Sequence, residues 1–234
     1  MTNKHLFFDL DRTLWDFERN SMKALEVLFL EFQLADSIRN FYSFHGTYKR
    51  INATLWKKYG KGKIKKEELR DERFIRTLSA FDIHDKELAI RISDSYVDIS
   101  PKQTLLFPDT LDTLEELKRL NYQMHIITNG FEEIQHIKLD NSKLKPFFDV
   151  IVCSENVGCT KPDVRVFQYA MQKANALASN SVMIGDDREV DVMGALRAGM
   201  RAILFDSENQ YSNTKNEFKI QNINELPLLL AMMK

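Results

Sequence analysis

Two carboxylates at the end of a short apolar run are the most informative residues in this sequence. The run from Leu6 to Phe8 leads directly into Asp9 and Asp11, which are separated by a single leucine. Because residues i and i+2 of a strand share one face, both carboxylates can reach the same ligand at the mouth of a sheet. Two acids this close repel each other, and a bound Mg²⁺ would offset that repulsion and leave one acid free to act as a nucleophile. The pair predicts a metal-assisted site, with an ordinary acidic turn as the alternative.

A second apolar run ends in Thr128, Asn129 and Gly130. This tripeptide places a hydroxyl and several backbone N–H groups at the start of a predicted helix, which is a suitable cradle for an anion. A simple helix cap followed by a turn glycine is the alternative interpretation. The tripeptide is therefore a candidate phosphate-binding loop whose role depends on the residues around it.

Two more loops carry charged residues. Lys161 lies just before a proline that can begin a helix, although a single loop lysine is usually only solvated. After a further apolar run, Gly185 permits a tight turn, and three aspartates follow it: Asp186, Asp187 and Asp191. Helix capping accounts for at most one of these three acids.

The polar residues at the predicted strand ends form a chemically coherent set. Carboxylates hold a hard cation such as Mg²⁺, while an ammonium and a hydroxyl balance the charge of phosphoryl oxygens. The set therefore suits a phosphate ester and a magnesium ion. No arrangement of serine, histidine and aspartate is visible in the sequence, which disfavours acyl transfer.

The composition is that of an ordinary globular protein. The 234 residues are 44% hydrophobic and 29% charged, and a formal net charge of -1 gives no basic field that would attract nucleic acid. No apolar stretch is long enough to span a membrane, and the first residues lead into a strand rather than a signal peptide. We therefore expect a cytoplasmic protein without nucleic-acid or membrane partners. Cys153 and Cys159 are expected to be reduced thiols, because no metal-ligand spacing surrounds them.

The chain divides into two patterns of apolar residues. From about residue 17 to residue 100 these residues recur at helical spacing, which predicts about four helices and no strand. Beyond residue 109, helical and strand-like segments alternate. The predicted elements are helix 110–120, strand 124–128, helix 131–141, strand 150–153, helix 164–174, strand 182–184, helix 191–198 and strand 202–205.

The alternating part predicts an α/β fold, namely a Rossmann-like parallel sheet with helices on both faces. The strand at residues 6–10 must belong to this sheet. We therefore expect a core domain formed by residues 1–16 and 104–234 and an inserted α-helical bundle, residues 17–103, that serves as a cap. Open parallel sheets bind ligands beyond the carboxyl ends of their strands, so the loops at those ends should carry the chemistry.

The order of these motifs resembles the haloacid dehalogenase-like (HAD) hydrolase superfamily over the whole chain. The resemblance rests on Asp9, Asp11 and Thr13, then Thr128 after a strand, then the Lys161–Pro162 pair, then the loop GDDREVD. It implies that Asp9 is a nucleophile forming an aspartyl-phosphate. It also implies that Asp11 protonates the leaving group and then activates water.

The same resemblance implies the ligands of phosphate and metal. Thr128, Asn129 and Lys161 would bind the phosphoryl group. Asp186 would join Asp9 and the backbone carbonyl of Asp11 on Mg²⁺. Asp187 and Asp191 would lie around the metal or serve as alternative ligands. A small phosphorylated substrate is the expected partner, and the sequence leaves monomer and homodimer equally open.

Two further features concern the substrate. The founding dehalogenases of the superfamily lack the second acid of the first motif, so Asp11 favours a phosphatase. Arg12 stands where the family often has glycine, and it can contact the substrate, the helical insertion or only solvent.

The stretch FFDLDRTLWDF, together with the four-helix insertion and the GDDREVD loop, resembles the pyrimidine 5′-nucleotidase branch. Pyrimidine nucleoside monophosphates are therefore the expected substrates. Phosphoglycolate and sugar phosphates remain alternatives, as do a haloacid dehalogenase and a phosphate-binding module without turnover.

Overall fold

A computed structural model of the protein describes residues 5–212 and 218–233. The predicted core also includes residues 1–4, 213–217 and 234, which lie outside the described residues. The described part contains a parallel sheet of six strands in the order β3-β2-β1-β4-β5-β6. The strands are β1 (His5–Phe8), β2 (Gln123–Thr128), β3 (Val150–Cys153), β4 (Ser181–Gly185), β5 (Arg201–Phe205) and β6 (Phe218–Ile220).

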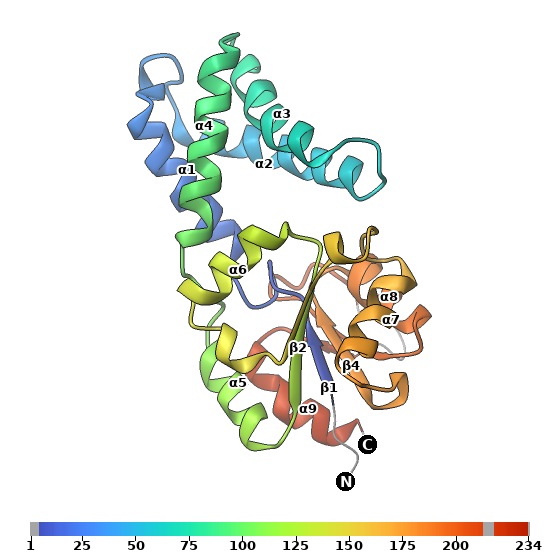
Figure 1. Ribbon diagram of the computed structural model, residues 1–234. Coiled ribbons are helices and arrows are strands. Elements are labelled where there is room, and N and C mark those ends of the chain that lie inside the picture. The colour runs from blue at the N-terminus through green and yellow to red at the C-terminus, as the bar shows by residue number, and fades with distance from the viewer. Residues whose placement is uncertain (1–4, 213–217, 234) are drawn as a thin grey trace. The chain divides into compact units, whose positions relative to one another are not determined.

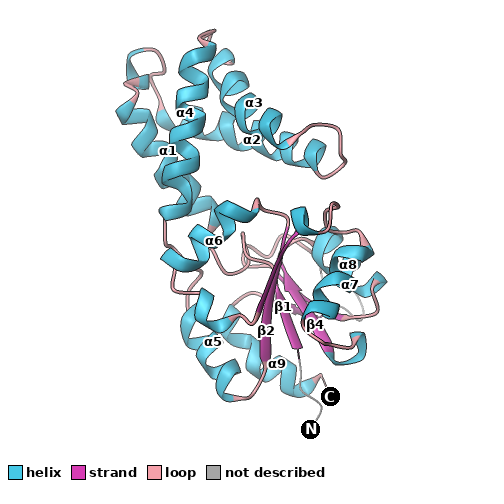
Figure 2. Ribbon diagram, in the orientation of Figure 1, coloured by secondary structure: helices cyan, strands magenta, loops and turns pink. Residues whose placement is uncertain are grey.

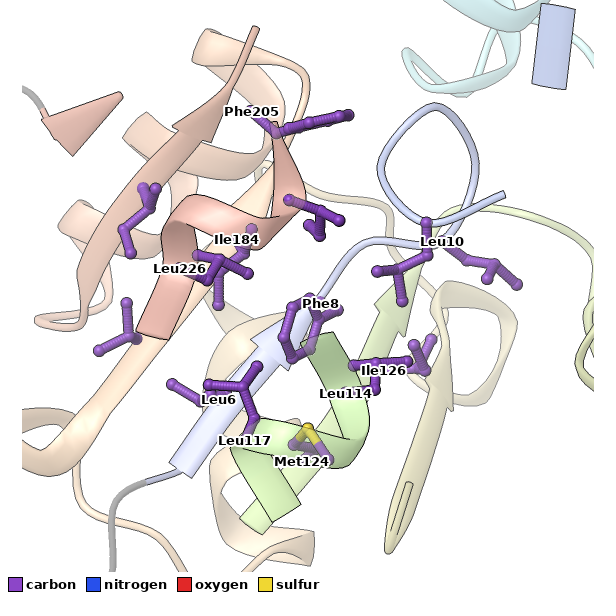
Figure 3. Packing of buried hydrophobic residues seen from close by; sticks show 14 of the residues in the cluster. Leu6, Phe8, Leu10, Leu114, Leu117, Met124, Ile126, Ile184, Phe205 and Leu226 are labelled. Atoms are coloured by element: carbon purple, nitrogen blue, oxygen red, sulfur yellow. The ribbon is translucent and has the colours of Figure 1, made fainter. Parts of the chain in front are cut away.

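Strand β1 lies in the middle of the sheet and is buried on both faces. Leu6 and Phe8 pack into one apolar cluster, whereas Phe7 packs into another on the opposite face. Figure 3 shows Leu6 and Phe8 against Leu114, Leu117 and Leu226, which come from helices. This burial on both sides explains why the strand is continuously apolar and confirms the predicted fold class.

Helices cover both faces of the sheet, as Figures 1 and 2 show for the strands and the helices beside them. The first cluster receives residues from α5 (Thr110–Arg119), α6 (Glu132–Asn141) and α9 (Leu226–Met232). The second cluster receives residues from α7 (Val164–Lys173) and α8 (Gly194–Arg197).

The strand order reverses around β1. Strands β2 and β3 lie on one side of it and β4, β5 and β6 on the other, so β1 pairs with both β2 and β4. In open α/β sheets such a reversal leaves a crevice at the carboxyl ends of the strands. The loops that follow β1, β2 and β4 therefore meet at one place.

The chain separates into two compact units. One comprises the residues up to Phe17 and those from Thr104 onward, and we call it the core unit. The other, Glu18–Gln103, is the helical unit. Its helices are α1 (Phe17–Glu31, which begins at the boundary), α2 (Phe41–Tyr59), α3 (Lys66–Ser79) and α4 (Lys86–Ile99).

The helical unit has an apolar core of its own. Leu28, Phe44, Phe74 and Ile92 are fully buried in it, and these residues come from all four helices. The helical spacing of apolar residues thus predicts the four helices correctly. Among the described residues, no helix combines the length and apolar character needed to cross a membrane.

The two segments that join the core unit to the helical unit lie side by side. The Asp16 N–H donates to the Leu105 carbonyl at 3.1 Å, and the Phe107 N–H donates to the Leu14 carbonyl at 3.0 Å. An antiparallel bridge between Trp15 and Leu106 lies among these bonds. The chain therefore leaves the core unit and returns to it at one position.

Two elements at the end of the chain are not predicted by the sequence. Strand β6 has only three residues, and its first residue, Phe218, is exposed. Helix α9 has the sequence LPLLLAM, which is apolar almost throughout and shows no helical period. In addition, the segment predicted as helix 191–198 begins earlier, with a π-helical turn at Arg188–Met193 that continues into α8.

Candidate active site

The loop after β1 presents Asp9 beside β4. The Asp9 N–H donates to the Ile184 carbonyl at 2.9 Å, which continues the pairing of the two strands by one residue. The chain then turns back, because the N–H groups of Leu14 and Trp15 both donate to the Leu10 carbonyl. Asp9 is buried by this turn, and only 7% of its surface is exposed.

Lys161 is the counter-ion of Asp9. Its Nζ lies 2.7 Å from Asp9 Oδ1, 2.6 Å from Asp191 Oδ1 and 2.7 Å from the Ile127 carbonyl oxygen. These three acceptors match the three N–H donors of an ammonium. Burial alone would lower the pKa of Lys161, but the carboxylates of Asp191 and Asp9 outweigh it and raise that pKa above its usual range.

The side chain of Asn129 fixes the backbone of Lys161. Asn129 Oδ1 accepts from the Lys161 N–H at 2.8 Å, and its Nδ2 donates to the Lys161 carbonyl at 3.1 Å. Ser154 Oγ donates to Asn129 Oδ1 and, at 3.0 Å, to the Thr128 carbonyl. In this structure the Asn129 amide therefore positions the lysine, and its contact with phosphate stays a prediction.

Thr128 ends β2 as a buried residue next to this network. Its hydroxyl oxygen accepts from the Gly130 N–H at 3.1 Å, a bond that does not use the hydroxyl proton. A side chain at Gly130 is excluded, because an added Cβ would lie 1.6 Å from Gln135 Nε2. Gly130 is thus required by the space that Gln135 occupies.

Three acids gather where β1 and β4 end. Asp9, Asp186 and Asp191 each offer a carboxylate oxygen, and these oxygens lie within 4.8 Å of one another. Gly185 makes room for this group, since a Cβ there would lie 2.4 Å from the Asp191 carboxylate. The structure therefore places Asp191 with the candidate metal ligands.

Asp187 is turned away from this group. Its Oδ1 accepts from the N–H groups of Glu189 and Val190 at 2.9 Å each, so it caps the following helical turn. Of the two acids that the sequence leaves as alternative ligands, Asp191 joins the cluster and Asp187 does not.

The electrostatics of the acid cluster favour a cation. Burial raises the pKa of Asp9 to about 7, although Lys161 opposes the shift and Asp191 adds to it. Burial and the charges of Asp191 and Asp9 raise the pKa of Asp186 well above its usual range. Three carboxylate oxygens around one point are the hard ligands that Mg²⁺ prefers, and its charge would stabilise their ionised forms. The residues present thus fit a magnesium ion.

Asp11 lies in different surroundings from Asp9. Its Oδ1 is 2.5 Å from Lys138 Nζ, and its Oδ2 accepts from Gln135 Nε2 at 3.0 Å. Both partners come from α6 and are buried. The sequence does not predict their contact with Asp11. Their spacing of three residues, which puts them on one face of the helix after Thr128, is the only signal in the sequence.

Arg12 follows Asp11 in a left-handed backbone conformation, with φ of 69°. Its guanidinium carbon lies 4.3 Å from the centre of the Phe17 ring. Its charge also lowers the pKa of Asp186, although burial dominates the shift of that residue. The side chain thus contacts an aromatic residue of the core unit and acts electrostatically on the acid cluster.

Comparisons with known proteins find relatives that match this chain over most of its length. The sequence profile of haloacid dehalogenase-like hydrolases matches residues 6–205. The pyrimidine 5′-nucleotidase YjjG of Escherichia coli is 28% identical over 97% of this chain and 97% of its own. The pyrimidine 5′-nucleotidase PynA of Streptococcus pneumoniae is 31% identical over 92% of this chain and 89% of its own.

A solved structure is similar over the whole chain. The HAD-hydrolase YfnB of Bacillus subtilis, crystallised with magnesium bound, superposes with a TM-score of 0.87 at 26% identity. The match covers 99% of this chain and all of the other.

Proposed function

Because the chain belongs to the haloacid dehalogenase-like hydrolase family, and is thus a hydrolase, we propose that it removes phosphate from pyrimidine nucleoside 5′-monophosphates with the help of Mg²⁺. The observation that carries the proposal is the contact of a buried lysine with a buried acid at the carboxyl ends of the strands, beside two more acids. The nucleotide substrate is supported by two relatives that are named pyrimidine 5′-nucleotidases and match nearly the full length.

The proposed reaction has two displacements at phosphorus. In the first, an Asp9 carboxylate oxygen forms a bond to phosphorus while the bond to the ester oxygen breaks. Asp11, as a carboxylic acid, gives its proton to the departing oxygen. In the second, a water oxygen attacks the aspartyl-phosphate and loses a proton to Asp11. The bond between Asp9 and phosphorus then breaks, which releases inorganic phosphate.

Lys161 and the acids have different electrostatic roles in the proposed reaction. The Lys161 ammonium, held between Asp9 and Asp191, is placed to neutralise phosphoryl oxygens as the group transfers. Asp9, Asp186 and Asp191 would hold Mg²⁺, together with the Asp11 carbonyl. The bound ion would supply positive charge to the transferring group. The magnesium bound in the similar YfnB structure supports the choice of Mg²⁺ as the ion.

We also propose that residues 17–103 act as a cap that selects the substrate, over a core of residues 1–16 and 104–234. Several aromatic residues of the helical unit are buried in its interior, as for Tyr48 and Phe74, whose ring centres lie 5.1 Å apart. Trp56 and Tyr59 are partly exposed and Tyr42 is exposed, so these three are candidates for stacking on a base.

A phosphate-release screen tests the proposal. The purified protein is assayed with nucleoside monophosphates, phosphoglycolate and sugar phosphates, each with and without a chelator. We expect turnover that needs Mg²⁺ and a preference for pyrimidine nucleotides of roughly tenfold or more, the value of one stacked base. A better rate with phosphoglycolate or a hexose phosphate would reject the nucleotide while leaving the phosphatase intact. Turnover that is insensitive to the chelator would reject the metal.

A further inference from the structure

We propose that Lys138 and Gln135 of α6 are positioning residues that hold the Asp11 carboxylate where it exchanges a proton with the leaving-group oxygen. The inference rests on the proposed phosphatase function, and it deepens that function by assigning two residues that no sequence motif marks. Each residue binds a different oxygen of Asp11, at 2.5 Å for Lys138 and 3.0 Å for Gln135.

Lys138 is enclosed between Asp11 and an aromatic ring. Only 4% of its side chain is exposed, and its Nζ lies 4.2 Å from the centre of the Trp15 ring. A buried ammonium needs such partners, and the face of a tryptophan is the aromatic surface that a cation prefers. The loop that carries Asp11 thus also supplies the second contact for the same ammonium.

The loop itself is fixed, so the contact fixes the carboxylate. The Trp15 N–H donates to the Leu10 carbonyl at 2.9 Å, and the Arg12 N–H donates to the Trp15 carbonyl at 2.9 Å. These bonds close the turn around Asp11. Lys138 therefore connects helix α6 to a rigid loop through one carboxylate and one ring.

Gln135 is the second residue that holds the Asp11 carboxylate, and its buried amide oxygen lowers the stability of the protein. It is 1% exposed, and its Oε1 has no hydrogen-bond partner among the described residues. A buried polar atom without a partner destabilises the folded protein, and a buried ion pair often stabilises a protein no more than packed apolar residues do. Stability therefore does not explain why two polar residues face Asp11.

The chemistry leaves room for the proposed role. Each carboxylate oxygen has two lone pairs, so Asp11 Oδ2 can accept from Gln135 and still carry the proton that it transfers. Asp11 is a loop residue with 20% of its side chain exposed. Without the contacts from Lys138 and Gln135, its carboxylate would be free to take other positions. Misplacement of a catalytic group by about 1 Å can cost on the order of 10²-fold in rate.

Substrates with different leaving groups separate positioning from a structural role. An aryl phosphate has a good leaving group that scarcely needs a proton, whereas an alkyl phosphate depends on one. We expect Lys138→Met and Gln135→Leu to lower kcat for the alkyl phosphate by about 10- to 100-fold and to lower it much less for the aryl phosphate. Mg²⁺ affinity and KM should change little. Lys138→Arg should restore part of the loss.

Matched variants serve as controls. Lys145→Met removes a lysine that pairs with Asp140 at 2.9 Å, but on the surface, and should leave both rates unchanged. Gln135→Leu removes the buried Oε1 that has no hydrogen-bond partner among the described residues, so we expect this variant to melt no lower than the wild type. It keeps the test valid if Lys138→Met folds poorly.

The outcomes are distinct. Equal losses on the two substrates in a folded variant would overturn the positioning inference and leave the phosphatase standing. A wild-type protein that releases no phosphate from either ester with Mg²⁺ would overturn the proposed function and the inference together.

Discussion

Lys161 and Lys138 occupy two neighbouring regions of the site and differ in what surrounds them. Both are buried, and each pairs with one of the two acids that follow β1. Lys161 lies in a loop at the strand ends and contacts two carboxylates and a carbonyl. Lys138 lies on a helix and contacts one carboxylate and an aromatic ring.

The difference separates the roles of two acids that stand two residues apart. Asp9 belongs to a charge cluster with Asp186 and Asp191, where the Lys161 ammonium balances part of the negative charge and a bound Mg²⁺ would balance more of it. Asp11 has its own ammonium and its own amide outside that cluster. The side chains of the two acids are therefore held by different partners.

Removal of Asp9, the proposed nucleophile, should have the largest effect. Asp9→Asn replaces a carboxylate with an amide, which is a poor nucleophile, so we expect phosphate release to fall on the order of 10⁴-fold or more. The assay is phosphate release from an aryl phosphate at saturating Mg²⁺. Asp140→Asn, a change at an exposed acid, is the control and should keep full activity. Substantial turnover by Asp9→Asn would remove Asp9 from the nucleophile's role.

Loss of Lys161 should come next. Lys161→Met removes the ammonium that faces Asp9, and loss of such an electrostatic group costs about 10²- to 10³-fold in kcat. The loss should be similar for aryl and alkyl phosphates, because Lys161 acts on the transferring group rather than on the leaving oxygen. If Lys161→Met lowered kcat only for the alkyl phosphate, Lys161 would behave as we expect of Lys138, and the proposed difference between the two lysines would be wrong.

The acid cluster should show its effect in metal affinity. Asp186→Ala and Asp191→Asn each remove the charge of a proposed ligand, and we expect Mg²⁺ to bind roughly tenfold more weakly or worse. Asp187→Asn keeps the helix cap and should bind Mg²⁺ like the wild type. Isothermal titration with Mg²⁺ measures all three. Equal weakening by Asp187→Asn and Asp191→Asn would contradict the separation of these acids in the structure.

The smallest effect concerns the buried pair of histidines His5 and His125. His5 Nδ1 lies 3.1 Å from His125 Nε2 on β1 and β2, and burial lowers the pKa of His125 to about 4. In the unfolded chain His125 binds a proton as the pH falls below about 6.5, whereas in the folded chain it binds this proton only near pH 4. The free energy of unfolding should fall by roughly 2–3 kcal/mol as the pH falls through this window.

Urea unfolding at several pH values measures this loss. His125→Gln cannot take up the proton, so its stability should depend less on pH between about 6.5 and 4 than that of the wild type. Identical slopes for the two proteins would show that His125 does not titrate as the structure indicates.

The sequence predicts the core of the site because the acids follow apolar strands. Asp9, Thr128 and Asp186 each stand where a buried run ends, and parallel strands bring such ends together. The choice between Asp187 and Asp191 is not visible in the sequence. It depends on the turn after Gly185, which directs one acid inward and leaves the other as a cap.

Lys138 and Gln135 show a different limit. In the sequence they are two polar residues of a predicted helix, and such residues usually face solvent. Only the packing of α6 against the Asp11 loop buries them. In the same way, β6 and α9 are not predictable from their own residues, because a three-residue strand and an unpatterned apolar stretch carry no periodic signal.

The bridge between Trp15 and Leu106 has an evolutionary consequence. The two segments that join the core unit to the helical unit lie side by side, so for the core unit the helical unit is an insertion equivalent to one long loop. The entropic cost of closing a loop grows only with the logarithm of its length, by about 0.6 kcal/mol for each doubling. Recombination at this junction can exchange one insertion for another of different size at little cost in folding. On our proposal that the helical unit selects the substrate, substrate preference can then diverge between descendants of such a chain while the acids and Lys161 at the strand ends are inherited unchanged.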